Sequence, residues 1–142
     1  MSEATERRSL WHEPPSDDPR TWPIDRLAYI GDAVFELYVR MAVAGRSRQA
    51  TGALHGMSVR LVSAAAQTAA CARISDMLSE DEAALLKRGR NAKPHSLPKH
   101  AEQSVYRQAT GFEALLGYLY LSGQDERLAA VCRRALEVDE HD

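Results

Sequence analysis

Two acidic residues stand alone in otherwise apolar, helix-patterned stretches of the chain. Asp32 lies within residues 27–37, and Glu113 lies within residues 109–121. Carboxylates are rarely buried unless they are paired or bind a metal. Packing of the two helices would therefore bring both acids into a shared cleft that can hold a hard, oxygen-liganded cation. Spacing alone leaves an alternative, in which each acid binds an arginine side chain in a partly buried pair.

Small residues accompany both acids. Gly31 precedes Asp32 and allows another backbone to approach closely. Gly111 and Gly117 flank Glu113, and they predict a tight helix–helix contact there.

Further charges follow Asp32 along the same predicted helix. Glu36 lies one turn after Asp32 and adds a second carboxylate, while Arg40 lies one more turn along. We expect Glu36 and Arg40 to form a surface ion pair that contributes little to stability.

The elements that position these residues are predicted to be helices. The chain has 142 residues, enough for one domain with a substantial core, and no segment alternates with a period of two. We therefore predict an all-α fold. Residues 1–21 are rich in proline and are interpreted as a flexible lead-in, and residues 22–138 form the domain. The predicted helical segments are residues 24–45, 47–78 (one helix or two), 80–88, 101–121 and 125–138.

Two details of these helices can be tested. Ser79 and Glu82 have the spacing of a capping box at the start of the third segment. In the second segment, one face is predicted to carry Met57, Leu61, Ala64, Ala65 and Thr68.

The net charge of −2 conceals an uneven distribution of charge. Residues 90–100 contain two prolines and several bases, which predicts a basic loop that a polyanion would recognise. An ordinary solvated connection is the alternative, and His95 and His100 are interpreted as incidental to any chemistry. The predicted contacts to such a polyanion are Lys87, Arg88, Arg90, Asn91, Lys93 and Lys99.

The remaining composition excludes several classes of protein. Cys71 and Cys132 are far apart in sequence, which argues against a zinc site or a disulfide framework. No apolar run is long enough to span a membrane, and the N-terminus does not have the pattern of a signal peptide. We expect a cytoplasmic protein that does not bind membranes.

Four segments resemble the ribonuclease III family, and most narrowly its short Mini-ribonuclease III branch, which lacks a double-stranded-RNA-binding domain. The resemblance covers residues 22–136. The segments that carry it, in the order and spacing of the family, are residues 27–34, 88–93, 106–113 and 112–121.

The resemblance implies a two-fold homodimer that hydrolyses double-stranded RNA, such as a ribosomal RNA precursor, with Mg²⁺ or, as a substitute, Mn²⁺. It assigns catalysis and metal binding to Asp32 and Glu113. Asp25 stands where the family has another acid, whereas Ala28 and Thr110 occupy acidic positions without supplying a carboxylate.

The resemblance also suggests roles around the metal and at the dimer interface. Tyr106 and Arg107 would lie just outside the metal ligands, with core packing as the alternative for Tyr106. The first helix is predicted to form part of the dimer seam through Ala28, Tyr29, Ile30, Gly31 and Phe35.

Two other functions remain open at this point. A non-catalytic helical RNA-binding module acting in ribosome assembly would explain the missing acids. A helical protein-interaction domain would require all four matches to be coincidence.

Overall fold

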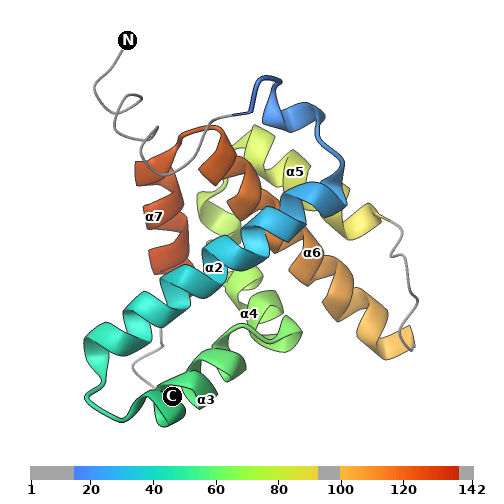
Figure 1. Ribbon diagram of the computed structural model, residues 1–142. Coiled ribbons are helices and arrows are strands. Elements are labelled where there is room, and N and C mark those ends of the chain that lie inside the picture. The colour runs from blue at the N-terminus through green and yellow to red at the C-terminus, as the bar shows by residue number, and fades with distance from the viewer. Residues whose placement is uncertain (1–14, 93–99, 138–142) are drawn as a thin grey trace.

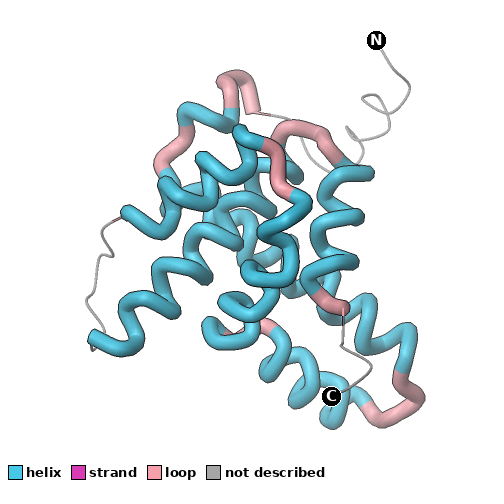
Figure 2. Tube along the Cα trace, turned by 180° about the vertical axis from the view of Figure 1, so that it is seen from behind, coloured by secondary structure: helices cyan, strands magenta, loops and turns pink. Residues whose placement is uncertain are grey.

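The computed structural model describes residues 15–92 and 100–137, and this part of the chain contains helices and loops but no strand (Figures 1 and 2). The predicted all-α class is confirmed. No helix in these ranges is long and apolar enough to cross a membrane. The elements are η1 (Pro19–Thr21), α2 (Ile24–Arg46), α3 (Thr51–Leu61), α4 (Ala64–Ile74), η2 (Ser75–Met77), α5 (Glu80–Asn91), α6 (His100–Leu121) and α7 (Asp125–Ala135).

Local sequence signals account for the ends of several helices. The predicted capping box is confirmed: the Ser79 hydroxyl accepts from the Glu82 amide, and the Glu82 carboxylate accepts from the Ser79 amide. The Ser63 hydroxyl caps α4 by accepting from the Ala66 amide. Gly123 follows α6 with a φ of 76°, a conformation that glycine adopts without strain.

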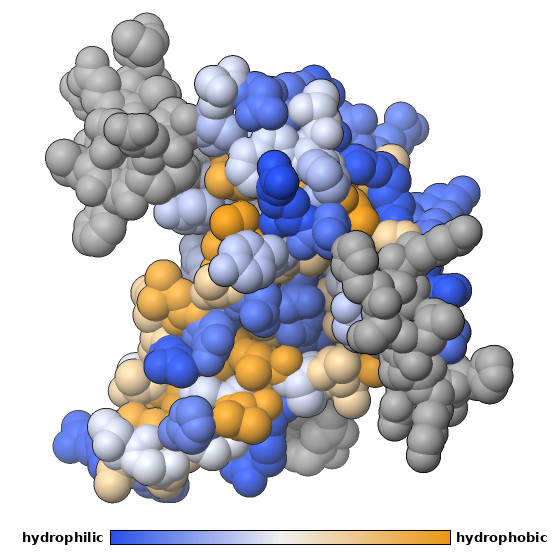
Figure 3. Space-filling view, turned by 45° about the vertical axis from the view of Figure 1, so that its right-hand side comes forward, coloured by the Kyte–Doolittle hydropathy of each residue, from blue (hydrophilic) through white to orange (hydrophobic). Residues whose placement is uncertain are grey.

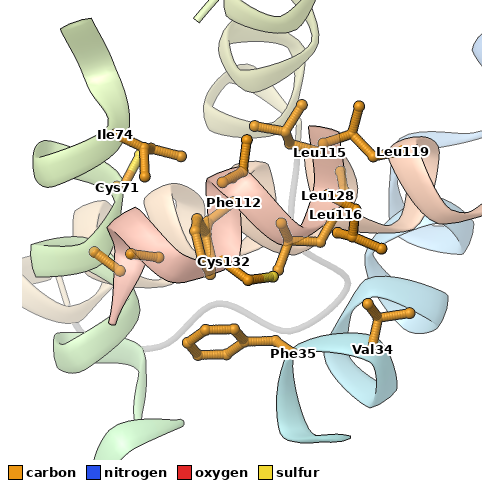
Figure 4. Close-up of a cluster of buried hydrophobic side chains, with 14 of the residues drawn as sticks. Val34, Phe35, Cys71, Ile74, Phe112, Leu115, Leu116, Leu119, Leu128 and Cys132 are labelled. Atoms are coloured by element: carbon orange, nitrogen blue, oxygen red, sulfur yellow. The ribbon is translucent and has the colours of Figure 1, made fainter. Parts of the chain in front are cut away.

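The hydrophobic core surrounds α6, which packs against α2, α4, α5 and α7 (Figure 1). Phe112 of α6 meets Phe35 of α2 edge to face, with ring centroids 5.0 Å apart. Figure 4 shows Cys71 and Ile74 of α4 and Cys132 of α7 converging on the same cluster. Both cysteines are free and buried.

The buried face of α4 differs from the predicted one. Ala64 and Ala65 are exposed, as is Leu61, whereas the buried residues of α4 are Gln67, Ala70, Cys71 and Ile74. Val62 and Ser63 are not helical, so α3 and α4 are separate helices. A single helical period therefore does not run through both. The predicted face was wrong because it assumed that continuity.

Glycines bring the backbones of α2 and α6 into direct contact. A Cβ atom placed on Gly31 would lie 1.6 Å from the carbonyl oxygen of Glu113, and one on Gly117 would lie 2.0 Å from the carbonyl oxygen of Leu27. No side chain fits in either position. The close approach predicted from these glycines is confirmed, and it sets Asp32 beside Glu113.

A second pair of glycines joins α5 to α6. A Cβ atom on Gly89 would lie 2.2 Å from the Cα atom of Gly111. In the first turn of α5, Glu82 receives a bidentate ion pair from Arg127 of α7, at 2.6 and 2.8 Å. Glu82 is buried, and this partner lowers the pKa of its carboxyl group. Together these contacts fix α5 against the C-terminal half of the fold.

The contact at Gly31 generates a stability prediction. Gly31→Ala should destabilise the protein by at least about 3 kcal/mol, because the added methyl group must push α2 away from α6. Urea unfolding at neutral pH measures the change. Gly45→Ala is the matched control, since Gly45 lies in the same helix with nothing within 4 Å of its added Cβ. Equal stability of the two variants would contradict the role given to the glycine contact.

Candidate active site

Asp32 and Glu113 face a common cavity of about 390 Å³. Asp32 projects from α2 at the exposed mouth, and Glu113 projects from α6 and is half-buried. The Gly31 contact places these two residues next to each other. The cavity is lined by Asp25, Ala28, Tyr29, Asp32, Val62, Ala64, Gln67, Tyr106, Ala109, Thr110 and Glu113.

The electrostatics of the cavity work against two ionised acids. Burial, together with a hydrogen bond to the neighbouring Asp32 carboxylate and charge repulsion from it, raises the pKa of Glu113 to about 8. A hydrogen bond from Gln67 acts in the opposite direction. The fold therefore disfavours the ionised form of Glu113 beside Asp32 unless a positively charged partner is present.

Among the described residues, no arginine side chain supplies that partner. The cavity lining includes no Lys, Arg or His. The ion pairs in the described ranges lie elsewhere, and one of them is the predicted pair of Arg40 and Glu36, at 2.8 Å. The alternative in which arginines neutralise Asp32 and Glu113 finds no support in this part of the chain.

The donor set suits a hard divalent cation with few protein ligands. Within the described ranges, no group of three or more His, Cys, Asp or Glu residues could hold a metal. Two carboxylates facing one open cavity nevertheless match Mg²⁺, which keeps several waters and needs only one or two carboxylates from the protein. Asp32 and Glu113 are the residues that would hold it.

Apart from Arg107, the other positions predicted near the metal reach the same cavity. Asp25 lines it without joining Asp32 and Glu113 in a three-acid group, and Ala28 and Thr110 line it without contributing charge. Tyr106 also lines it and is 45% exposed, so core packing, the alternative for this residue, was wrong.

A second cavity, of about 510 Å³, lies between α5 and α6 and is basic. Arg107 lines this second cavity, in contrast to its neighbour Tyr106. The Nε atom of Arg107 is buried and has no hydrogen-bond partner among the described residues. The lining residues are Lys87, Arg90, Asn91, Gln103, Ser104, Arg107 and Gln108.

The structure revises the predicted basic loop. Arg90 and Asn91 lie in the last turn of α5 and not in a loop, because the helix continues to Asn91. Lys93 and Lys99 fall outside the described residues. Arg88 points in another direction, since its guanidinium donates to the carbonyl oxygens of Arg20 and Trp22, each at 3.2 Å. A phosphate would have to compete with those two bonds.

Sequence reasoning missed Gln67 of α4, which contributes to the first cavity and is only 3% exposed. Its side-chain Nε2 donates to the carbonyl oxygen of Val62 at 3.0 Å. A signal was present in the sequence. Gln67 precedes Ala70, Cys71 and Ile74 with helical spacing, which places a polar residue on an apolar face.

The raised pKa of Glu113 predicts how the metal-free protein responds to pH. The folded state binds the Glu113 proton more tightly than the unfolded state, whose carboxyl has the ordinary pKa of about 4.5. This contribution to stability is complete below pH 4.5 and is lost as pH rises through about 8. As the pH rises from 5 to 9, the free energy of unfolding of the wild type should therefore fall by roughly 2 to 4 kcal/mol more than that of Glu113→Gln, because one pKa unit corresponds to about 1.4 kcal/mol.

Urea unfolding in the presence of a chelator measures this difference. Glu36→Gln is the control, because Glu36 lies on α2 outside the cavity. If the wild type and Glu113→Gln have parallel pH profiles, the proposed environment of Glu113 is wrong.

Comparisons with known proteins agree with this geometry. The model of the ribonuclease III domain family matches residues 25–124, a range that includes both acids. A Mini-ribonuclease 3 from Thermoanaerobacter sp. (strain X514) is 47% identical over 114 residues, which are 80% of each chain. A Mini-ribonuclease 3 from Symbiobacterium thermophilum is 44% identical, covering 84% of this chain and 92% of that one.

A crystal structure of a Fusobacterium nucleatum protein has the same fold. It superposes with a TM-score of 0.72 at 27% identity and covers 83% of this chain and 94% of that one. Matches at these levels over most of the chain, together with paired acids in an open cavity, leave the family in no doubt: the chain belongs to the ribonuclease III family and is an endoribonuclease.

Proposed function

We propose that this chain is a Mg²⁺-dependent endoribonuclease that cleaves double-stranded RNA as a homodimer. The observation that carries the proposal is the cavity in which Asp32 and Glu113 meet without a basic side chain. We propose structured ribosomal RNA precursors as its substrates and the cytoplasm as its place of action. Mn²⁺ would substitute, because the two carboxylates offer the oxygen donors that both ions accept.

Asp32 and Glu113 would bind the cation from two different helices. When bound, Mg²⁺ polarises a phosphodiester and supplies an activated water for its hydrolysis. Rigid placement is the contribution of the protein: the backbone contact at Gly31 fixes α2 against α6, and the carboxylates follow. Tyr106, half-exposed at the same cavity, is positioned to contact the RNA or the waters of the ion.

The basic cavity supports binding of the RNA backbone. A-form RNA hides its bases in a deep, narrow groove, so a protein recognises the duplex mainly through phosphates, 2′-hydroxyls and shape. Lys87, Arg90 and Arg107 supply positive charge at this cavity, and Asn91 supplies an amide for sugar contacts. The unpartnered Nε of Arg107 is a donor that an anion would satisfy.

The catalytic part of the proposal predicts a specific loss of cleavage. Asp32→Asn and Glu113→Gln should each lower the cleavage rate of a long RNA duplex by about a thousandfold or more, since the bound ion contributes several kcal/mol to the reaction. Gel assays with Mg²⁺, with Mn²⁺ and with a chelator measure the rates.

The control for this assay is Glu36→Gln. Glu36 lies one helical turn after Asp32 and pairs with Arg40, outside the cavity, so its amide variant should cleave at the wild-type rate. A wild type that binds duplex RNA but never cuts it with either ion would contradict the proposal and favour a non-catalytic RNA-binding module.

A dimer can use only part of the predicted seam. Gly31 and Phe35 are buried within the protein itself, so the part of the prediction that rests on them was wrong, and Ala28, 8% exposed, faces the cavity. Tyr29 is 80% exposed and remains available. Gly31 and Phe35 are buried because α2 turns this face towards α6.

We propose that a second copy covers the outer stripe of α2 and the neighbouring part of α3. Leu37 and Met41 lie one turn apart on α2 and are 59% and 60% exposed, and Val59 and Leu61 of α3 are also exposed. Figure 3 shows apolar surface interrupting polar surface over the lower part of the molecule, where α2 and α3 lie in Figure 1. Exposed apolar patches are typical of association sites. A two-fold dimer would present two equivalent sites to the two strands of a duplex.

The double variant Leu37→Glu and Met41→Glu should therefore convert the dimer to a monomer, because four carboxylates would meet in an apolar interface. Light scattering after size-exclusion chromatography measures the mass. Ala83→Glu, at an exposed position on α5, is the control and should leave the mass unchanged. A double variant that stays dimeric would place the interface on another surface.

A further inference from the structure

Gln67 is a polar residue in a position where an apolar residue would satisfy the packing. It is 3% exposed and shares a face of α4 with Ala70, Cys71 and Ile74. Figure 4 shows Cys71 and Ile74 of this face pointing into the hydrophobic cluster around Phe112. Gln67 has no part in the function proposed above, so its presence needs a physical reason.

Among the described residues, the amide group of Gln67 has a hydrogen-bond partner for its nitrogen but none for its oxygen. Its Nε2 donates to the carbonyl oxygen of Val62 at 3.0 Å, which fixes the orientation of the amide plane. Its Oε1 is buried and has no partner among the described residues. A buried, unpaired oxygen costs folding free energy, so packing alone does not favour glutamine here.

The Gln67 amide can form further hydrogen bonds, and its side chain lies at the candidate metal site. Gln67 lines the same cavity as Asp32 and Glu113, and it reaches that cavity from a third helix, α4. Its Nε2 carries a second hydrogen besides the one donated to Val62, and the Glu113 carboxylate of the same cavity is an acceptor for it. A donor to a carboxylate orients it as a metal ligand.

We infer that Gln67 is a positioning residue, whose amide, anchored on the Val62 carbonyl, holds the Glu113 carboxylate beside Asp32 ready to bind a divalent cation. This inference rests on the proposed function, because it assumes that Asp32 and Glu113 bind the ion. It assigns α4 a part in the site, in addition to α2 and α6.

Binding of Mn²⁺ to the full chain without RNA tests the inference. Free Mn²⁺ is measured by electron paramagnetic resonance at one fixed pH. Gln67→Leu should weaken Mn²⁺ binding about 10- to 100-fold, the usual effect of removing a group that orients a metal ligand. Circular dichroism in chelator establishes that the variant is folded, and Gln67→Met serves as a second variant of similar size should the leucine variant not fold.

Thr68→Val is the matched control. Thr68 is the next residue of α4, and its hydroxyl bonds the carbonyl oxygen of Val105 in α6 at 3.3 Å without lining the cavity. This variant loosens the α4–α6 contact but leaves the amide of Gln67 in place, so its Mn²⁺ binding should match that of the wild type within about twofold.

The results distinguish the role of Gln67 from the existence of the metal site. Unchanged Mn²⁺ binding by Gln67→Leu, with binding by the wild type intact, would overturn the role of Gln67 and leave the metal site standing. Equal weakening by Thr68→Val would overturn it as well, because loosened packing would then explain both effects. A wild type that binds no Mn²⁺ would overturn the metal site and the role of Gln67 with it.

Discussion

Direct backbone contact between α6 and its neighbours is the constraint on which the rest of the structure depends. Gly31 and Gly117 let α2 touch α6, and Gly89 and Gly111 let α5 touch it on another side. At these distances a single added carbon atom would clash with backbone, so the helices have almost no freedom to slide. Glu113 lies between the two contacts in sequence, and its position is therefore fixed by packing that involves no charged group.

That packing imposes an electrostatic cost on the folded state. Asp32 and Glu113 are brought together by the glycine contact and not by attraction, and burial of Glu113, reinforced by the neighbouring Asp32, raises its pKa to about 8. A cavity that keeps two acids close without a basic partner favours binding of a cation, since the cation removes repulsion that the fold has already imposed. Rigidity is thus what connects the core of the protein to its chemistry.

The sequence predicted those parts of the structure that depend on local patterns. Helical periodicity identified the helices, the capping box at Ser79 marked the start of α5, and the isolated acids marked the cavity. The buried face of α4 was not predictable in the same way, because the break at Val62 resets the helical period. The bonds from Arg88 to the residues before α2 join segments far apart in sequence, and no periodicity marks them.

The two cavities explain how a chain of net charge −2 can be suited to a polyanion. Tyr106 and Arg107 are adjacent on α6, yet one lines the acidic cavity and the other the basic cavity. An RNA phosphate would be repelled by Asp32 and Glu113 alone and attracted by Lys87 and Arg107. Local fields of this kind govern the approach of a charged ligand more than the total charge does. Under the proposed function, the basic cavity would draw the RNA backbone towards the protein, and a cation held by the two acids would remove the repulsion between the neighbouring cavity and a phosphate.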